Sequence, residues 1–215
     1  SELAELEPFA KGVQALHSPK TGIIDFRSVV EKCAEIITRE GGTIRLSTEV
    51  LGLEVRSGEC SVATPQGGCQ ASLVINCAGL FSDRVATMAG VPHDLKIFPF
   101  RGEYYTLRPE SRGLVKNLIY PVPDPQFPFL GVHFTRGIDG NIEAGPNAVL
   151  ALAREGYRKS QVDLTDLLEM VSYPGFWRMA QKHWAQGFRE YYRSLSKPAF
   201  VRTLQKLVPA VTSSD

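Results

Sequence analysis

Residues 72–83, SLVINCAGLFSD, contain the pattern around which the rest of the chain is organised. Residues 73–76 predict a short strand with an apolar, β-branched centre and no alternation, as in a strand that is covered on both faces of a parallel sheet. Small residues follow at 77–79, and small residues allow a ligand to approach the backbone closely. Ser82 is then a candidate N-cap and Asp83 a first-turn acid for a helix. The segment predicts strand, tight turn and helix, the arrangement that meets ligands at the carboxyl edge of an α/β sheet, although an ordinary strand-to-helix turn has the same pattern.

The composition is that of a globular protein. The 215 residues are 43% apolar and 22% charged, which is enough for one large or two small domains. A net charge of +1 gives no basic surface for nucleic acid. No apolar run reaches the roughly 18 residues of a membrane span. The four cysteines have neither CxxC spacing nor the density of a disulfide scaffold, which favours a cytoplasmic protein, at most peripheral at the inner face of a membrane.

The chain on the N-terminal side of residue 76 predicts an α/β unit with a small β-meander. Phe26–Arg39 has apolar residues at helical spacing and ends at a Gly-Gly pair. A hairpin turn is expected at 65–68, PQGG. The expected strands are Thr43–Val50, Leu51–Arg56, Glu59–Ala63 and Gln70–Asn76.

The chain after residue 90 predicts an antiparallel sheet followed by helices. Asp139 and Gly140 form a hairpin signal between the last two of the expected strands, which are 96–107, 118–122, 129–135 and 141–145. Helices are expected at 83–89, 164–171, 176–195 and 199–207. Apolar and aromatic residues recur at helical spacing and are expected in the core: Phe176, Met179, Trp184, Phe188, Tyr191 and Tyr192. The fold class predicted is mixed α/β (α+β).

Several stretches, in this order, resemble the FAD-dependent oxidoreductases of the D-amino-acid-oxidase superfamily, and within it the L-2-hydroxyglutarate dehydrogenase/oxidase family. They are ALHSPKTGIID at 15–25, VINCAG at 74–79, FRGEYY at 100–105, IYPVP at 119–123, GVHFTR at 131–136, DG at 139–140 and GPNA at 145–148. The first two are shared across the superfamily. The segments RGEY and GVHFT are the ones that make the resemblance specific to the L-2-hydroxyglutarate dehydrogenase/oxidase family.

The resemblance implies FAD and the oxidation of a 2-hydroxy acid, in particular L-2-hydroxyglutarate to 2-oxoglutarate, by hydride transfer to the flavin. The implied electron acceptor is oxygen or a membrane quinone. The implied domains are a partial FAD-binding domain at 1–95, a substrate-binding antiparallel sheet with helices at 96–195 and the start of a return to the FAD domain at 196–215. The family's phosphate loop has no counterpart, since no GxGxxG occurs, and the family's C-terminal segment is also absent. We therefore expect a fragment of a longer protein that is inactive and binds FAD poorly by itself.

The candidate cofactor contacts are Val50, Cys77, Ala78, Gly79 and Gly102. The resemblance implies that Val50 meets the adenine through its backbone. The other four are small residues that let a ligand reach the main chain, and Gly102 would let either the flavin or the substrate come close. No metal site is expected, because the histidines and cysteines never cluster at ligand spacing.

Oxidation of a 2-hydroxy acid needs a base for the hydroxyl proton, and His133 is the candidate. In an alternating strand its side chain points away from those of Val132 and Phe134, and an imidazole titrates in the useful range. The alternative is a hydrogen-bonded core histidine.

The substrate's carboxylates need a cation or hydroxyl groups. Arg101 is the candidate cation, because a guanidinium binds a carboxylate in a bidentate manner, and the alternative is a salt bridge to Glu103. Tyr104 and Tyr120 are the candidate hydroxyl donors, although buried tyrosines are also common in cores.

Two other functions fit the same residues. One is an amine or amino-acid oxidase of the same superfamily, because the shared motifs specify flavin and not substrate. The other is a non-catalytic interaction module, in which the C-terminal helices present aromatic anchors at Trp177, Trp184, Tyr191 and Tyr192. The expected Arg101/His133 pair on adjacent strands favours an enzyme, because an interaction module has no need of it.

Overall fold

A computed structural model describes residues 2–56, 58–123, 125 and 131–215, and it divides into two compact units. The sheet unit consists of Ser1–Asp25, Phe100–Leu150 and Gly175–Asp215, and the meander unit of Phe26–Pro99 and Ala151–Pro174. This grouping differs from the boundaries expected at 95/96 and 195/196. Both chain ends fall in the sheet unit, and Ala151–Pro174 falls with the residues before 100.

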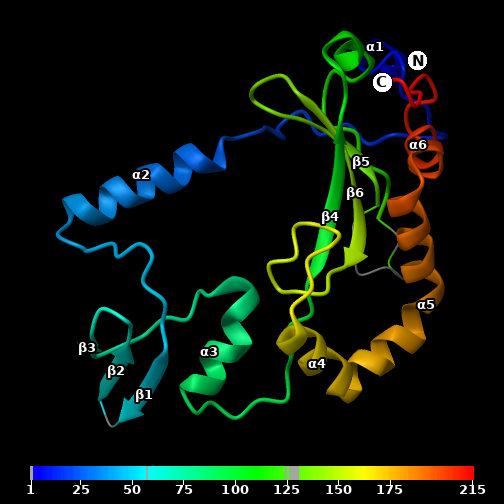
Figure 1. Cartoon of the computed structure of the whole chain (residues 1–215). Coiled ribbons are helices and arrows are strands. Elements are labelled where there is room, and N and C mark those ends of the chain that lie inside the picture. Colours follow the sequence, from blue (N-terminus) through cyan, green and yellow to red (C-terminus); the bar gives the residue numbers. More distant parts are fainter. Residues whose placement is uncertain (1, 57, 124, 126–130) are drawn as a thin grey trace. The chain divides into compact units, whose positions relative to one another are not determined.

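The sheet unit is built on three antiparallel strands, β4 (Phe100–Thr106), β5 (His133–Arg136) and β6 (Ile142–Leu150), in the order β4-β6-β5 (Figure 1). This confirms the predicted antiparallel sheet and the hairpin at Asp139-Gly140, where Gly140 has a φ of +78°. β6 extends further than the predicted 141–145. The predicted strand 118–122 contributes a single bridge, between Ile119 and Phe134. Phe129 and Leu130, predicted to begin β5, lie outside the described residues.

Helices α1 (Glu2–Leu6), α5 (Pro174–Leu195) and α6 (Lys197–Leu204) and the 3₁₀ helix η2 (Pro109–Leu114) complete the sheet unit. Phe200 of α6 lies in the core, with its ring centroid 5.0 Å from that of Tyr105. The core consists of Leu107, Val115, Val132, Phe134, Ile142, Ala144, Phe200, Val201, Leu204, Val208 and Val211. One face of the sheet is therefore committed to packing.

The aromatic stripe of α5 is largely exposed, which contradicts its predicted place in the core. Phe176 is buried, but Trp184, Phe188, Tyr191 and Tyr192 are 72%, 73%, 42% and 54% exposed. The buried residues of the helix are Phe176 and Glu190. They are fourteen residues, or about four turns, apart, so they lie on the same side of the helix. Glu190 lies toward the sheet because Oε2 of its carboxylate accepts a hydrogen bond from the Ala148 amide at 3.2 Å. A polar contact to the sheet thus sets the orientation of this helix.

The meander unit contains the antiparallel sheet β1-β2-β3 (Figure 1) and several helices. Its elements are α2 (Phe26–Arg39), β1 (Gly52–Arg56), β2 (Glu59–Ala63), β3 (Cys69–Ala71), η1 (Gly79–Phe81), α3 (Ser82–Met88) and α4 (Leu164–Ser172). The predicted helices and the meander are confirmed, and α2 has the predicted bounds.

Two predicted strands, Thr43–Val50 and Leu73–Asn76, do not form. Among the described residues no backbone ladder includes either segment, and a strand exists only when a neighbour takes its hydrogen bonds. Ser47 has a φ of +51°, which interrupts an extended chain, and Leu73 and Ile75 are 72% and 77% exposed. The parallel sheet expected around residues 73–76 is thus not found in the described part of the chain. The predicted mixture of helices and sheets is confirmed.

Candidate functional site

The candidate site lies on the sheet face opposite the core. Ala144 of β6 is in the core, so strand alternation turns Gly145 to the opposite face. Gly145 is paired with His133 on β5, and an added Cβ on Gly145 would lie 2.7 Å from Cδ1 of Tyr104 on β4. Tyr120 stacks on the imidazole, with ring centroids 4.3 Å apart and planes at 24°. We call Tyr104, Gly145, His133 and Tyr120 the histidine row.

The tautomer of His133 follows from its hydrogen bond. Its Nδ1 lies 2.9 Å from the carbonyl oxygen of Gly131, and because a carbonyl only accepts, Nδ1 must carry a proton. In the neutral ring Nε2 is then the unprotonated nitrogen. Nε2 forms no hydrogen bond to any residue that the structure describes. His133 is 6% exposed, and its orientation is fixed by the Gly131 bond and the Tyr120 stack.

Two tyrosine hydroxyls accompany the histidine. The ring of Tyr104 meets that of His133 edge-on, with centroids 6.5 Å apart. Burial, followed by the negative charge of Glu143 and the neighbouring Tyr120, raises the pKa of Tyr104, so its hydroxyl stays protonated and able to donate. The Tyr120 hydroxyl lies 3.5 Å from Oγ1 of Thr135, at the outer limit of a hydrogen bond.

The glycines near the row make room for the Tyr104 ring. A Cβ on Gly102 would lie 3.2 Å from Cε2 of Tyr104 and 3.3 Å from Cβ of Pro146. The space beside Gly102 is therefore occupied by the protein's own side chains. Its contact with a cofactor stays a prediction.

Arg101 lies on the other face of the sheet. Its neighbour on β4, Glu103, is paired with Asn147, whose side-chain amide donates to the Glu190 carbonyl of α5 at 2.7 Å. Arg101 is two residues from Glu103 and so shares that face, and it donates to Oε1 of Glu103 from Nη2 at 2.8 Å and from Nε at 3.2 Å. The expected placement of Arg101 and His133 on adjacent strands is wrong, because β6 lies between β4 and β5. The structure brings Tyr104, Tyr120 and His133 together and leaves Arg101 apart.

The small-residue turn 77–79 is held by a residue that the sequence reasoning missed. Oδ1 of Asn76 accepts from the Ala78 amide at 3.1 Å, and its Nδ2 donates to the Ser82 carbonyl at 2.9 Å. An Asn that precedes small residues is a known turn former, and this was the available signal. Ser82 begins α3 and does not cap it, since the N-cap is Phe81 without a side-chain hydrogen bond; Asp83 is in the first turn as predicted.

A family model described as DAO, FAD dependent oxidoreductase, matches residues 1–206. The chain belongs to this family. Its members are FAD-dependent, and this agrees with the resemblance found in the sequence.

Relatives in this family carry a more specific name. The chain is 51% identical over its whole length to an L-2-hydroxyglutarate dehydrogenase of Indibacter alkaliphilus, of which it covers 54%. It is 44% identical to the enzyme of that name from Escherichia coli K12 (100% of the chain, 51% of the relative) and 39% to the human mitochondrial one (100% and 49%). The chain thus spans about half the length of the curated relatives it matches.

A solved structure shares the fold. The L-proline dehydrogenase of P. horikoshii matches with a TM-score of 0.62 over 97% of this chain and 46% of its own, at 17% identity. At this identity the match concerns the fold alone.

The turn 77–79 fits a group that approaches the backbone. Gly79 has a φ of +54°, and a Cβ placed on it would meet nothing within 4 Å. Cys77 and Gly79 are exposed and Ala78 is half-buried, so the main chain is accessible here. Val50 is half-buried in a segment without secondary structure. FAD contacts at these residues remain predictions, from the small residues at 77–79 and from the family resemblance at Val50.

In the part of the chain that the structure describes, no helix is long and apolar enough to cross a membrane. Among the same residues, the His, Cys, Asp and Glu side chains include no group of three or more placed to bind a metal ion.

Proposed function

We propose that the full-length protein oxidises L-2-hydroxyglutarate to 2-oxoglutarate with FAD, and that His133 is the general base. The substrate is proposed from the 39–51% identity to relatives of that name. The observation that supports the chemistry is the hydrogen bond from Nδ1 of His133 to the Gly131 carbonyl, which leaves Nε2 as the proton acceptor.

The proposed reaction divides the two hydrogens of the substrate's CH–OH group. FAD, when bound, accepts the α-hydrogen with its electron pair. Nε2 of His133 takes the hydroxyl proton, and the O–H electron pair forms the C=O bond. The rings of Tyr120 and Tyr104 hold the imidazole in place and shield it from water, so that proton transfer begins from one orientation.

We propose Tyr104 and Tyr120 as donors to the substrate's oxygens, because they share the face of His133. For Arg101 to bind the substrate as predicted, a substrate carboxylate would have to displace Glu103 from the guanidinium. Glu103→Gln tests that role directly. If Arg101 binds the substrate, weakening the competing ion pair should lower the KM for L-2-hydroxyglutarate.

The experiment is an anaerobic titration of the purified full-length protein. We expect it to be yellow, and its flavin absorbance to bleach on addition of L-2-hydroxyglutarate but not of the D enantiomer. Bleaching by a glycine-type amine instead would identify an amine oxidase, and a colourless protein that takes up no FAD would refute the proposal. The acceptor, proposed to be oxygen or a membrane quinone, is then found by reoxidising the bleached enzyme with each. Recovery of the enzyme with washed membranes tests the proposed peripheral location.

A further inference from the structure

A buried arginine contacts the chain directly after the small-residue turn. Arg154 follows β6 in sequence, belongs to the meander unit and is 5% exposed. Its Nη1 donates to the carbonyl oxygen of Leu80 and to Oδ1 of Asp83, and its Nη2 donates to Oδ2 of Asp83 at 2.8 Å. The guanidinium also lies over the Phe81 ring, 5.8 Å from the centroid. One side chain thus binds three of the four residues from 80 to 83.

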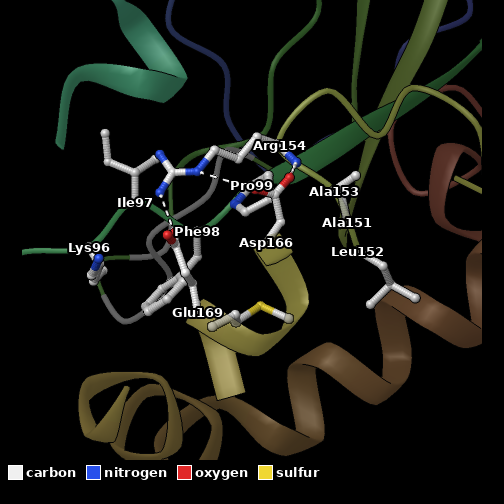
Figure 2. Close-up of a pocket in the computed structure, with 11 residues that line it drawn as sticks. Lys96, Ile97, Phe98, Pro99, Ala151, Leu152, Ala153, Arg154, Asp166 and Glu169 are labelled. Atoms are coloured by element: carbon white, nitrogen blue, oxygen red, sulfur yellow. Dashed lines mark hydrogen bonds and ion pairs between the residues drawn. The ribbon is translucent and has the colours of Figure 1, made fainter. Parts of the chain in front are cut away.

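Helix α4 holds this arginine from the other side. Asp166 and Glu169, three residues apart, lie on one face of α4 and point toward Arg154 (Figure 2). Oδ2 of Asp166 accepts from the Arg154 amide at 2.7 Å, and Oε2 of Glu169 lies 3.3 Å from Nη2. The same two carboxylates bind Arg84 of α3, at 2.5 and 3.0 Å. The cluster therefore joins α3 and α4 through two arginines with different contacts.

Asp83 completes the arrangement. Its Oδ2 accepts from the Ile97 amide at 3.1 Å, and its Oδ1 from the Arg84 amide at 2.9 Å. Burial by itself raises the pKa of this carboxyl, but hydrogen bonds from Arg154 and the Ile97 amide outweigh burial and lower the pKa to about 2. Asp83 is therefore a carboxylate at every physiological pH.

Stability alone does not account for such a cluster. Replacing a buried ion pair by apolar side chains is often neutral or stabilising, because desolvating the charges costs as much as their attraction returns. A bidentate arginine does fix direction, since its donors are coplanar and rigid. The feature it fixes here is the Leu80 carbonyl, one residue after Gly79, together with the first turn of α3.

We propose that Arg154 is a positioning residue for the flavin contact of the turn 77–79. By holding Leu80 and Asp83 against α4, it keeps the backbone of the turn in the conformation that the cofactor meets. This inference rests on the proposed function, in which that turn contacts FAD. It assigns flavin affinity to a side chain that follows β6 and is separated from the turn by more than seventy residues.

Arg84 is the matched control for the experiment. It binds the same two carboxylates as Arg154, but its guanidinium makes no contact with Leu80 or with the Asp83 carboxylate among the described residues. Full-length Arg154→Lys and Arg84→Lys are compared in urea unfolding and in FAD dissociation from the folded protein. We expect Arg154→Lys to raise the FAD dissociation constant on the order of 10- to 100-fold, which corresponds to the loss of one charge-assisted contact. We expect Arg84→Lys to leave the FAD dissociation constant unchanged.

The outcomes separate this inference from the proposed function. Equal FAD affinities of two folded variants would overturn the role of Arg154, whereas a wild-type protein that binds no FAD would overturn the proposed function itself. If Arg154→Lys does not fold, Asp83→Asn takes its place, because Asn keeps the shape but weakens the hold on Arg154. A folded Asp83→Asn with wild-type FAD affinity would equally refute the inference. When FAD is saturating, we expect the rate of flavin reduction in Arg154→Lys to return to the wild-type value. A globally damaged protein would stay slow at any FAD concentration.

Discussion

Replacing His133 with asparagine separates the two tasks that the structure gives to its imidazole. The amide nitrogen of Asn can lie near the position of Nδ1 and donate to the Gly131 carbonyl, as the histidine does at 2.9 Å. Nothing in Asn replaces Nε2. His133→Asn should therefore keep the local fold and lose the base, whereas His133→Ala loses both.

The magnitudes differ for the two measurements. A lost general base slows the chemical step by about 10²–10⁴-fold, or about 3–5 kcal/mol of activation free energy. In His133→Asn the main loss of stability is the stacking with Tyr120, about 0.5–1.5 kcal/mol. His133→Ala should be less stable again by about 1 kcal/mol, the value of the Gly131 hydrogen bond. The two variants should thus share a rate and differ in free energy of unfolding.

The assay is stopped-flow reduction of the flavin by L-2-hydroxyglutarate, without oxygen, in the full-length protein, with urea unfolding alongside. The residual rate of His133→Asn should rise with pH, because an ionised alcohol needs no base. A wild-type rate of reduction in folded, flavin-loaded His133→Asn would refute the assignment. Unfolding of both variants would instead identify a core histidine.

Three other substitutions test the turn, the cation and the core. Gly79→Val should leave a folded protein without flavin, because a side chain at a φ of +54° is strained by about 1–2 kcal/mol and fills the open space beside the backbone; a normal flavin content, measured by absorbance, would indicate an ordinary connection. Arg101→Lys should raise the KM for the hydroxy acid more than it lowers kcat if the fork binds substrate, and an unchanged KM would leave Arg101 as the structural partner of Glu103. Phe134→Ala should lower the free energy of unfolding by about 3–5 kcal/mol in urea, since the ring is fully buried, and a loss below about 1 kcal/mol would contradict its place in the core.

Features that depend on neighbouring residues in the chain could be predicted from the sequence. The bounds of α2, the meander β1-β2-β3 and the hairpin at Asp139-Gly140 follow from periodicity and turn chemistry that a short window contains. The contact between Arg154 and Asp83 cannot be predicted from a short window, because the two residues are 71 positions apart in the sequence. No local pattern indicates that a buried arginine will meet a given aspartate.

Strands are harder because they need a partner. Residues 73–76 have the composition of a buried strand, but composition does not supply a neighbour, and in the described chain the segment is exposed. The stripe of α5 shows the same limit for helices. The sequence of α5 is amphipathic, and its aromatic side would be expected to face the sheet. Glu190 contacts the sheet instead, because its carboxylate accepts a hydrogen bond from a backbone amide of β6.

The position of Arg101 depends on a single extra residue in β6. The pairing of β4 with β6 shifts between Glu103 and Tyr105, so that β6 uses one more residue than β4 over this stretch. Without this shift, Tyr105 would pair with Gly145, which is paired with His133. Its alternate neighbours on β4, Glu103 and Arg101, would then lie on the same face as His133. With the bulge, Tyr104 takes that place and Arg101 lies on the opposite face, where its guanidinium binds Glu103.

The sequence does contain a signal for this bulge. Pro146 stands in the central strand of the sheet, and a proline inside a strand is confined to edges or bulges because it cannot donate to the ladder. In an alternating strand, one inserted residue exchanges every side chain between the two faces. The choice of Tyr104 over Arg101 as the neighbour of His133 is therefore made on β6, by the bulge at Gly145-Pro146, and not by β4, where both residues lie.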